Sequence, residues 1–189
     1  MPLIYPIKGI SPVIGKNTFI AENATIVGDV VMGDNCSVWF NTVIRGDVHS
    51  IRIGNNVNIQ DGAVVHCTYQ KAPVNIGNNV SIAHSAIIHG CTIHDNVLIG
   101  MGAIVMDGAV IESNSIVAAG AVVSQNCIVE SGSVYAGVPA KKIKSVDKSL
   151  LEGQVNRISK SYTMYASWHN PEIMPLTDGS QKNPVDEEL

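Results

Sequence analysis

The sequence predicts an all-β protein, a parallel β-helix followed by a C-terminal α-helix, and three observations support this prediction. Large apolar residues recur at every sixth position over most of the chain before Lys141. A small or β-branched residue usually lies four positions after each of them. Aromatic residues make up only 5% of the chain and charged residues only 15%, while Gly, Val, Ile, Ala and Asn are abundant. That composition suits short strands joined by tight turns.

The six-residue period holds in four successive runs. Its apolar positions are Ile14, Ile20, Ile26, Met32, Val38 and Ile44, then Ile53, Ile59 and Val65, then Ile76, Ile82 and Ile88, and finally Ile93, Ile99, Val105, Ile111, Val117, Val123, Val129 and Tyr135. An α-helix would require recurrence at three and four instead. A hexad with one large and one small inward residue builds one flat side of a parallel β-helix. Three hexads close a coil of about 18 residues, so the chain holds about six or seven coils.

Two interruptions of the period are informative. Eleven residues instead of six separate Val65 from Ile76. We therefore expect a loop of five extra residues, around 69–73, to protrude from a corner of the β-helix. Near Ile88 one hexad is a residue short. Loops on a rigid scaffold often carry function.

The β-helix is expected to end near Gly137-Val138-Pro139-Ala140-Lys141. From Ser145 the apolar spacing changes to four and three, which predicts an amphipathic helix with Ser145 or Asp147 as its N-cap. Its apolar stripe consists of Leu151, Val155, Ile158, Tyr162 and Tyr165. We therefore divide the chain into a β-helix over 1–140, a helical segment over 141–170 packed on the β-helix, and an extended tail over 171–189.

Several classes of protein do not fit the composition. A net charge of −4 argues against a nucleic-acid partner. No apolar run reaches the roughly 18 residues of a membrane span, and the first residues lack the pattern of a signal peptide. The four cysteines (Cys36, Cys67, Cys91 and Cys127) form no CxxC pair, which favours free thiols and a cytoplasmic protein.

Three histidines are the main candidates for a functional site. His66 directly follows Val65, and His89 directly follows Ile88. Once the five-residue loop is subtracted, one complete coil separates them, so His66 and His89 should stack on one face. His84 lies five residues before His89, up to about 16 Å away in extended chain, so we expect it to join them only from a neighbouring copy.

Three neutral imidazoles with an open fourth position are the ligands of a catalytic zinc that activates water. We therefore expect a trimer with three interfacial metal sites. The alternative is that the three histidines hydrogen-bond carbonyl groups at an interface. His49, His94 and His169 are not assigned to the site.

The residues around these histidines resemble gamma-class carbonic anhydrases. The resemblance rests on Ile44-Arg45-Gly46-Asp47, Asn58-Ile59-Gln60-Asp61-Gly62, Val65-His66, and the stretch from Ile76 through His84 to His89-Gly90. It implies a left-handed β-helix of hexapeptide repeats that forms a homotrimer, with Zn²⁺ (or Fe²⁺ or Co²⁺) shared between adjacent subunits. It also implies reversible hydration of CO2 to bicarbonate by a metal-bound hydroxide.

The same resemblance implies a role for each site residue. His66, His84 and His89 match the metal ligands, and Arg45 and Asp47 match an interfacial ion pair. Gln60 matches a residue that hydrogen-bonds metal-bound water, Asp61 matches a partner of the arginine, and Asn58 matches a pocket residue. Trimer contact alone remains an alternative for Arg45 and Asp47, and a hydrogen bond at the coil edge remains one for Gln60.

Two departures from the family pattern keep other functions open. The loop after His66 carries no carboxylate, and Val48 follows Asp47 where the family has a glutamate. One alternative is a hexapeptide-repeat acyl-CoA transferase or thioesterase, because residues 137–141 resemble the segment that closes many such acyltransferases. The other is a trimeric metal-binding scaffold without catalysis.

Overall fold

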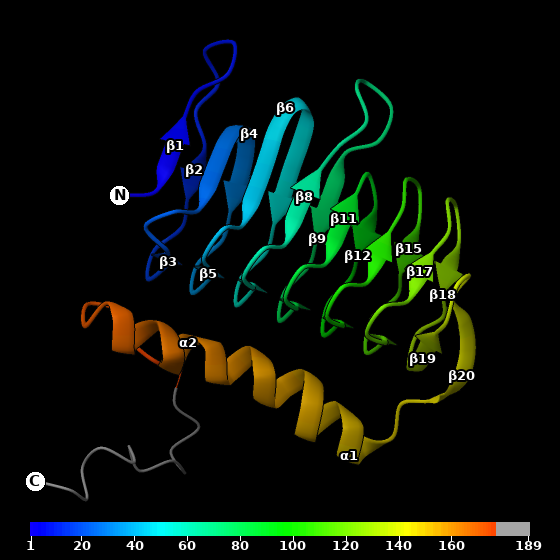
Figure 1. Cartoon of the computed structure of the whole chain (residues 1–189). Coiled ribbons are helices and arrows are strands. Elements are labelled where there is room, and N and C mark those ends of the chain that lie inside the picture. Colours follow the sequence, from blue (N-terminus) through cyan, green and yellow to red (C-terminus); the bar gives the residue numbers. More distant parts are fainter. Residues whose placement is uncertain (177–189) are drawn as a thin grey trace, which may run out of the picture.

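The computed structural model describes residues 1–176 of the chain. Parallel strands wind into a left-handed β-helix of about seven turns, and a C-terminal helix lies along its outside (Figure 1). The predicted fold class is confirmed. Most of the tail predicted over 171–189 lies outside the described residues.

The strands stack in three faces. Face 1 contains β1 (Leu3–Tyr5), the first parts of β4 (Thr25–Met32) and β6 (Val43–Ile53), β8 (Val64–His66), β11 (Ile87–His89), β14 (Ile104–Val105) and β17 (Val122–Val123). Face 2 contains β2 (Val13–Ile14), the second parts of β4 and β6, β9 (Val74–Ile76), β12 (Thr92–Ile93), β15 (Val110–Ile111) and β18 (Ile128–Val129). Face 3 contains β3 (Phe19–Ile20), β5 (Ser37–Val38), β7 (Asn58–Ile59), β10 (Ser81–Ile82), β13 (Leu98–Ile99), β16 (Ile116–Val117) and β19 (Ser133–Ala136). Because β4 and β6 continue around a corner, faces 1 and 2 share one hydrogen-bonded sheet.

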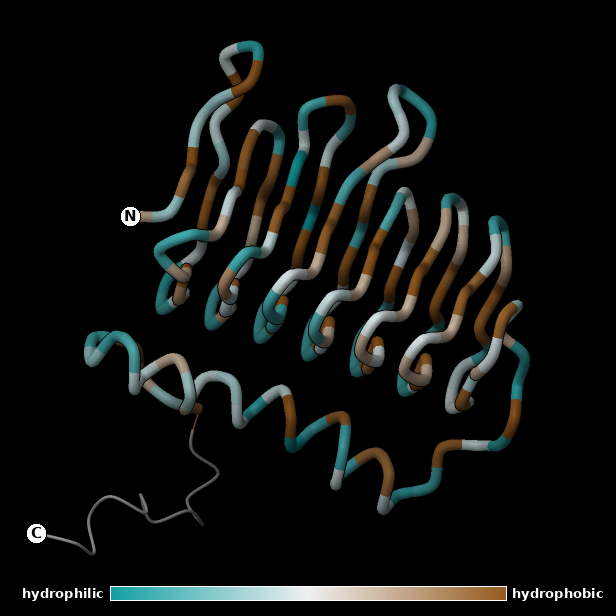
Figure 2. Tube along the Cα trace, viewed as in Figure 1, coloured by the Kyte–Doolittle hydropathy of each residue, from teal (hydrophilic) through white to brown (hydrophobic). Residues whose placement is uncertain are grey.

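The core is built from the hexad positions. All of them from Ile26 to Tyr135 are buried, as are the small residues between them, such as Ala63 and Ala86. In Figure 2 hydrophobic segments recur along the strands of every coil. Fully burying one such aliphatic side chain contributes roughly 1.5–3 kcal/mol, so the stacked rows are the main source of stability.

The length of a coil varies at one corner. Along face 1, Ile44 pairs with Val65, Val65 with Ile88, and Ile88 with Val105. The first two of these coils contain more residues than a plain coil. The third contains one residue fewer. The added and missing residues all fall between faces 1 and 2, where β6 bends and where the loop over 67–73 protrudes (Figure 1). The predicted loop and the predicted short hexad are therefore confirmed.

The C-terminal helical run covers face 3. It consists of α1 (Lys148–Leu150), the π-helical turn η1 (Leu151–Asn156) and α2 (Arg157–His169). Of the two predicted N-caps, Asp147 is the one used, since its carboxylate accepts a hydrogen bond from the Leu150 N–H at 2.8 Å. The run ends where the His169 ring packs against Phe19 and Trp39 of the first coils.

One element was not predicted. Within the segment assigned to the helix over 141–170, β20 (Lys141–Ser145) pairs antiparallel with β19 and closes face 3. The helix therefore begins only at Lys148. None of the helices in the described part of the chain has the length and apolar character needed to cross a bilayer.

Candidate metal centre

His66 and His89 lie side by side at the corner between faces 1 and 2. Register pairs Arg45 of β6 with His66 of β8, and His66 with His89 of β11. The Nδ1 atom of His66 is 3.1 Å from Nε2 of His89, and the ring centroids are 5.1 Å apart. The stacking predicted from the residue count is confirmed.

A carboxylate contacts the other nitrogen of each ring. Asp47 Oδ1 lies 3.1 Å from Nε2 of His66, and Asp107 Oδ1 lies 2.5 Å from Nδ1 of His89. A carboxylate favours a proton on the ring nitrogen that it contacts. Each ring then presents an unprotonated nitrogen to the other ring.

Two such nitrogens facing each other require a positive charge, either a proton or a metal ion. Two imidazole ligands at 2.0–2.1 Å from a tetrahedral zinc have nitrogens about 3.3 Å apart. The separation of 3.1 Å between the His66 and His89 nitrogens is close to this value. This donor pair therefore fits a metal ion.

Further contacts hold the two carboxylates in place. Asp47 Oδ2 accepts from Nη1 of Arg45 at 2.6 Å, and Asp107 Oδ2 accepts from the Thr68 hydroxyl at 2.5 Å. Although burial acts in the opposite direction, the hydrogen bonds from Arg45 and His66 lower the pKa of Asp47. Burial likewise opposes the effect of Thr68 and His89, which lower the pKa of Asp107. Both carboxylates are therefore ionised at neutral pH.

Burial also favours a neutral imidazole at His66. It lowers the pKa of His66 more than the hydrogen bond to Asp47 raises it, so the net shift is downward. A neutral imidazole is the form that binds a metal. The neighbouring thiols do not compete as ligands, because burial raises the pKa of Cys67 to about 11 and that of Cys91 to about 12.

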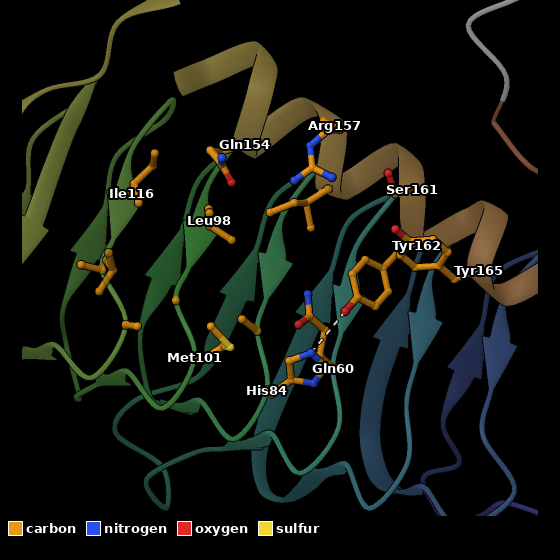
Figure 3. A pocket seen from close by; sticks show the side chains of 16 residues that line it. Gln60, His84, Leu98, Met101, Ile116, Gln154, Arg157, Ser161, Tyr162 and Tyr165 are labelled. Atoms are coloured by element: carbon orange, nitrogen blue, oxygen red, sulfur yellow. Dashed lines mark hydrogen bonds between the residues drawn. The ribbon is translucent and has the colours of Figure 1, made fainter. Parts of the chain in front are cut away.

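His84 lies apart, at the opposite edge of face 1, where the chain enters β11 from face 3. Its Nδ1 is 2.9 Å from Oδ2 of Asp61, and its Nε2 is 3.5 Å from the Tyr162 hydroxyl (Figure 3). All three predicted ligands thus have a carboxylate on one ring nitrogen. No three metal-binding side chains meet within the part of a single chain that the structure describes.

Asn58 and Gln60 lie on the His84 side. Both are buried, and the Gln60 amide donates to Oδ1 of Asn58 at 2.9 Å, while the Asn58 amide donates to the Ser81 hydroxyl at 2.8 Å. Gln60 and His84 line the same cavity. Asp61 contacts His84 within one chain, and its contact with Arg45 stays a prediction.

The unassigned histidines lie outside this arrangement. His94 is exposed in a turn, His169 packs among aromatic rings at the helix end, and Nδ1 of His49 accepts from the Ser50 N–H.

Sequence reasoning missed Asp107 and Thr68. Asp107 lies 18 residues after His89, but the coil between them is one residue short, so counting coils from His89 does not lead to Asp107. Tyr162 is predicted only as part of the apolar stripe of the helix, and in the structure its hydroxyl points toward His84 (Figure 3).

The surface of face 1 between the two edges is apolar. Its outward row, which successive strands place in register, is apolar except at Thr25 and consists of Leu3, Thr25, Val43, Val64, Ile87, Ile104 and Val122. Ile87 is 39% exposed. In the equivalent row of face 2 the polar residues Arg52, Asn75 and Thr92 interrupt the apolar residues Val13, Val31, Val110 and Ile128, and face 3 is covered by the helix. Face 1 is therefore the face best suited to contact another subunit.

The fold and site define a class of protein. It is a β-helix of six-residue repeats that carries histidine side chains able to bind a metal at both edges of one apolar face. Comparison with known proteins agrees. The family model described as bacterial transferase hexapeptide (six repeats) matches residues 11–46 and 90–125. A solved structure of a hexapeptide transferase family protein from Anaplasma phagocytophilum is 40% identical with a TM-score of 0.84, over 88% of this chain and 98% of that one.

Two curated relatives narrow the assignment. Protein YrdA of Escherichia coli is 36% identical over 188 residues, which cover 96% of this chain and 98% of YrdA. A carbonic anhydrase of Geobacillus kaustophilus is 44% identical over 105 residues, 56% of this chain and 57% of that protein, so the match spans little more than half of it. The chain belongs to the hexapeptide-repeat family, and its relatives include proteins named carbonic anhydrase.

Proposed function

We propose that the protein is a metal-dependent carbonic anhydrase of the gamma class, which hydrates CO2 reversibly to bicarbonate in the cytoplasm. The observation that carries the proposal is the pair of imidazole nitrogens of His66 and His89, 3.1 Å apart and each braced by a carboxylate. Carboxylate–histidine pairs of this kind are the usual support of a metal ligand.

The proposed active form is a homotrimer. His66 and His89 lie at one edge of face 1 and His84 lies at the other, so the two edges can meet only between different copies. A contact that joins the His66 edge of one subunit to the His84 edge of the next is heterologous. Such contacts form a closed ring when the rotation between successive subunits brings the last subunit back to the first. The apolar row of face 1 would be buried in the same contact.

In this proposal His66 and His89 of one subunit and His84 of the next hold Zn²⁺, with Fe²⁺ or Co²⁺ as alternatives. The ion would supply the acidity that makes water a nucleophile near neutral pH. Asp47, Asp61 and Asp107 fix which ring nitrogen of each histidine is free to bind.

Other side chains would orient the reactants. Because Asn58 holds the Gln60 amide nitrogen, the Gln60 side chain has a fixed direction beside His84. It can then orient a water molecule or CO2 by hydrogen bonding. Arg45 neutralises Asp47 and fixes its position against His66.

Stopped-flow CO2 hydration by the metal-loaded protein tests the proposal. We expect turnover that is lost together with bound metal in His84→Ala and kept in His94→Ala, which removes an exposed histidine outside the site. A metal-loaded trimer that does not hydrate CO2 would contradict the proposed activity.

Acyl transfer to or from coenzyme A, or thioester hydrolysis, is the second candidate. The similar Anaplasma protein is described as a transferase family member. The loop over 67–73, which lies beside His66, also lacks a carboxylate that could move protons. A transferase needs a histidine base rather than three metal ligands, so turnover of an acyl-CoA after metal removal would favour transfer. Metal binding without either activity would favour a non-catalytic scaffold.

A further inference from the structure

A cavity of about 430 Å³ lies between face 3 and the C-terminal helix. Its walls come from the outward side chains of β13 and β16 and from η1 and α2 (Figure 3). One end is formed by Gln60 and His84. This volume lies in the range of about 300–1,000 Å³ typical of small-molecule sites, and it is far more than the three atoms of CO2 require.

Most of the lining of the cavity is apolar, and its polar side chains are Gln60, His84, Gln154, Arg157 and Ser161. Leu98, Met101 and Ile116 contribute large side chains from the β-helix, and several alanines leave space between them. Tyr162 and Tyr165 add aromatic surface from the helix. Such walls favour a ligand with a hydrocarbon body.

One arginine, Arg157, lies on this lining. The Nε atom of Arg157 donates to the Gly153 carbonyl at 2.8 Å, which leaves the two terminal nitrogens of the guanidinium group available. Arg157 forms no ion pair with any residue from 1 to 176, and no carboxylate is among the described residues that line the cavity. A planar guanidinium group binds carboxylates through two parallel hydrogen bonds.

We propose that this cavity binds a small amphipathic carboxylate. Its hydrocarbon body would lie against Leu98, Met101 and Ile116, and its carboxylate would pair with Arg157. The site requires no metal ion, so it goes beyond the proposed CO2 chemistry. Because the cavity reaches His84, a ligand bound there would lie next to the proposed metal centre.

Isothermal titration calorimetry with octanoate tests the proposal, on the protein as purified and again after treatment with a chelator. We expect one octanoate per chain, and weaker binding of shorter carboxylates by about fourfold for each buried methylene removed. Octylamine and octanol should bind at least about tenfold more weakly, since neither pairs with a guanidinium group. Equal affinity for octanoate and octylamine, or no octanoate binding, would overturn the proposal.

Two variants locate the site. Arg157→Gln keeps the helix and removes the charge, and it should raise the Kd of octanoate about tenfold. Ser161→Phe should reduce binding by filling the cavity from the helix side. Arg52→Gln, the matched control on face 2, should leave the Kd unchanged.

A second readout does not depend on these substitutions. In protein labelled with ¹³C at the methionine methyl groups, octanoate should shift the Met101 resonance, identified by its loss in Met101→Leu. Binding that leaves Met101 unshifted, or that is equally tight in Arg157→Gln, would overturn the proposal. Neither result depends on whether the protein hydrates CO2.

Discussion

The Nδ1 atom of His66 lies 3.1 Å from Nε2 of His89, although 23 residues separate the two in the sequence. The backbone determines this proximity, because β8 and β11 pair in register from Val64 and Ile87 to the two histidines. The rings are therefore held by the hydrogen-bonded sheet rather than by a mobile loop. A rigid donor pair of this kind is what a tightly bound ion requires.

Mixing two inactive variants should restore part of the metal binding. His66→Ala and His84→Ala should each lose their sites. In trimers assembled from equal amounts of both, about one quarter of the interfaces would combine intact His66 and His89 with an intact His84 from the next subunit. Metal per chain, measured after unfolding, refolding and gel filtration, checks this. If the site lay within one chain, mixing would restore none.

Asp107→Asn should weaken metal binding about 10–100-fold without unfolding the protein, because the amide no longer holds the proton on Nδ1 of His89. Competition with a chromogenic chelator measures the affinity. Asp29→Asn is the matched control, since Asp29 pairs with Arg52 and contacts none of the three histidines. Equal losses in both variants would assign the effect to net charge.

Ile99→Ala should lower the free energy of unfolding by about 2–5 kcal/mol. Ile99 is fully buried in a stacked row, and the hydrogen-bonded coil cannot collapse to fill the space left by the removed side-chain atoms. Ile128→Ala makes the same change at a residue that is 60% exposed, and it should cost less than about 0.5 kcal/mol. Urea unfolding followed by circular dichroism measures both. Similar midpoints for the two variants would contradict the assignment of the core.

Asp147→Ala should destabilise the C-terminal helix by about 0.5–2 kcal/mol, because the Leu150 N–H loses its acceptor. Amide hydrogen exchange should accelerate over residues 148–156 and stay unchanged in the β-helix. Asp147→Ser should restore most of the protection, since serine also caps helices. Faster exchange throughout the chain would show that the helix and the coils unfold together.

The repeat made most of the fold predictable. Each coil is set by local hexads, so counting residues from Val65 to Ile88 placed His66 beside His89 without knowledge of any distant contact. The same regularity explains why the loop after His66 could be located. Asp107 was missed because its importance comes from a neighbouring coil, and nothing in its own hexad distinguishes it from a surface aspartate.

Elements outside the repeat were harder to predict. Lys141–Ser145 is rich in lysine and forms the edge strand of face 3. It pairs with β19 because the chain turns back beside that strand after the last coil, and no apolar spacing in the sequence indicates this pairing. The cavity beside His84 was not foreseen for a related reason. It results from how far the helix lies from face 3, which the spacing of Tyr162 and Tyr165 does not determine.

The varying length of the corner between β8 and β9 has a practical consequence. The coils before and after it keep their pairing although the chain there is five residues longer than a plain turn. Peptides of other lengths and charges could therefore be grafted over 69–73 to change what approaches the two imidazoles, while the scaffold below stays as it is.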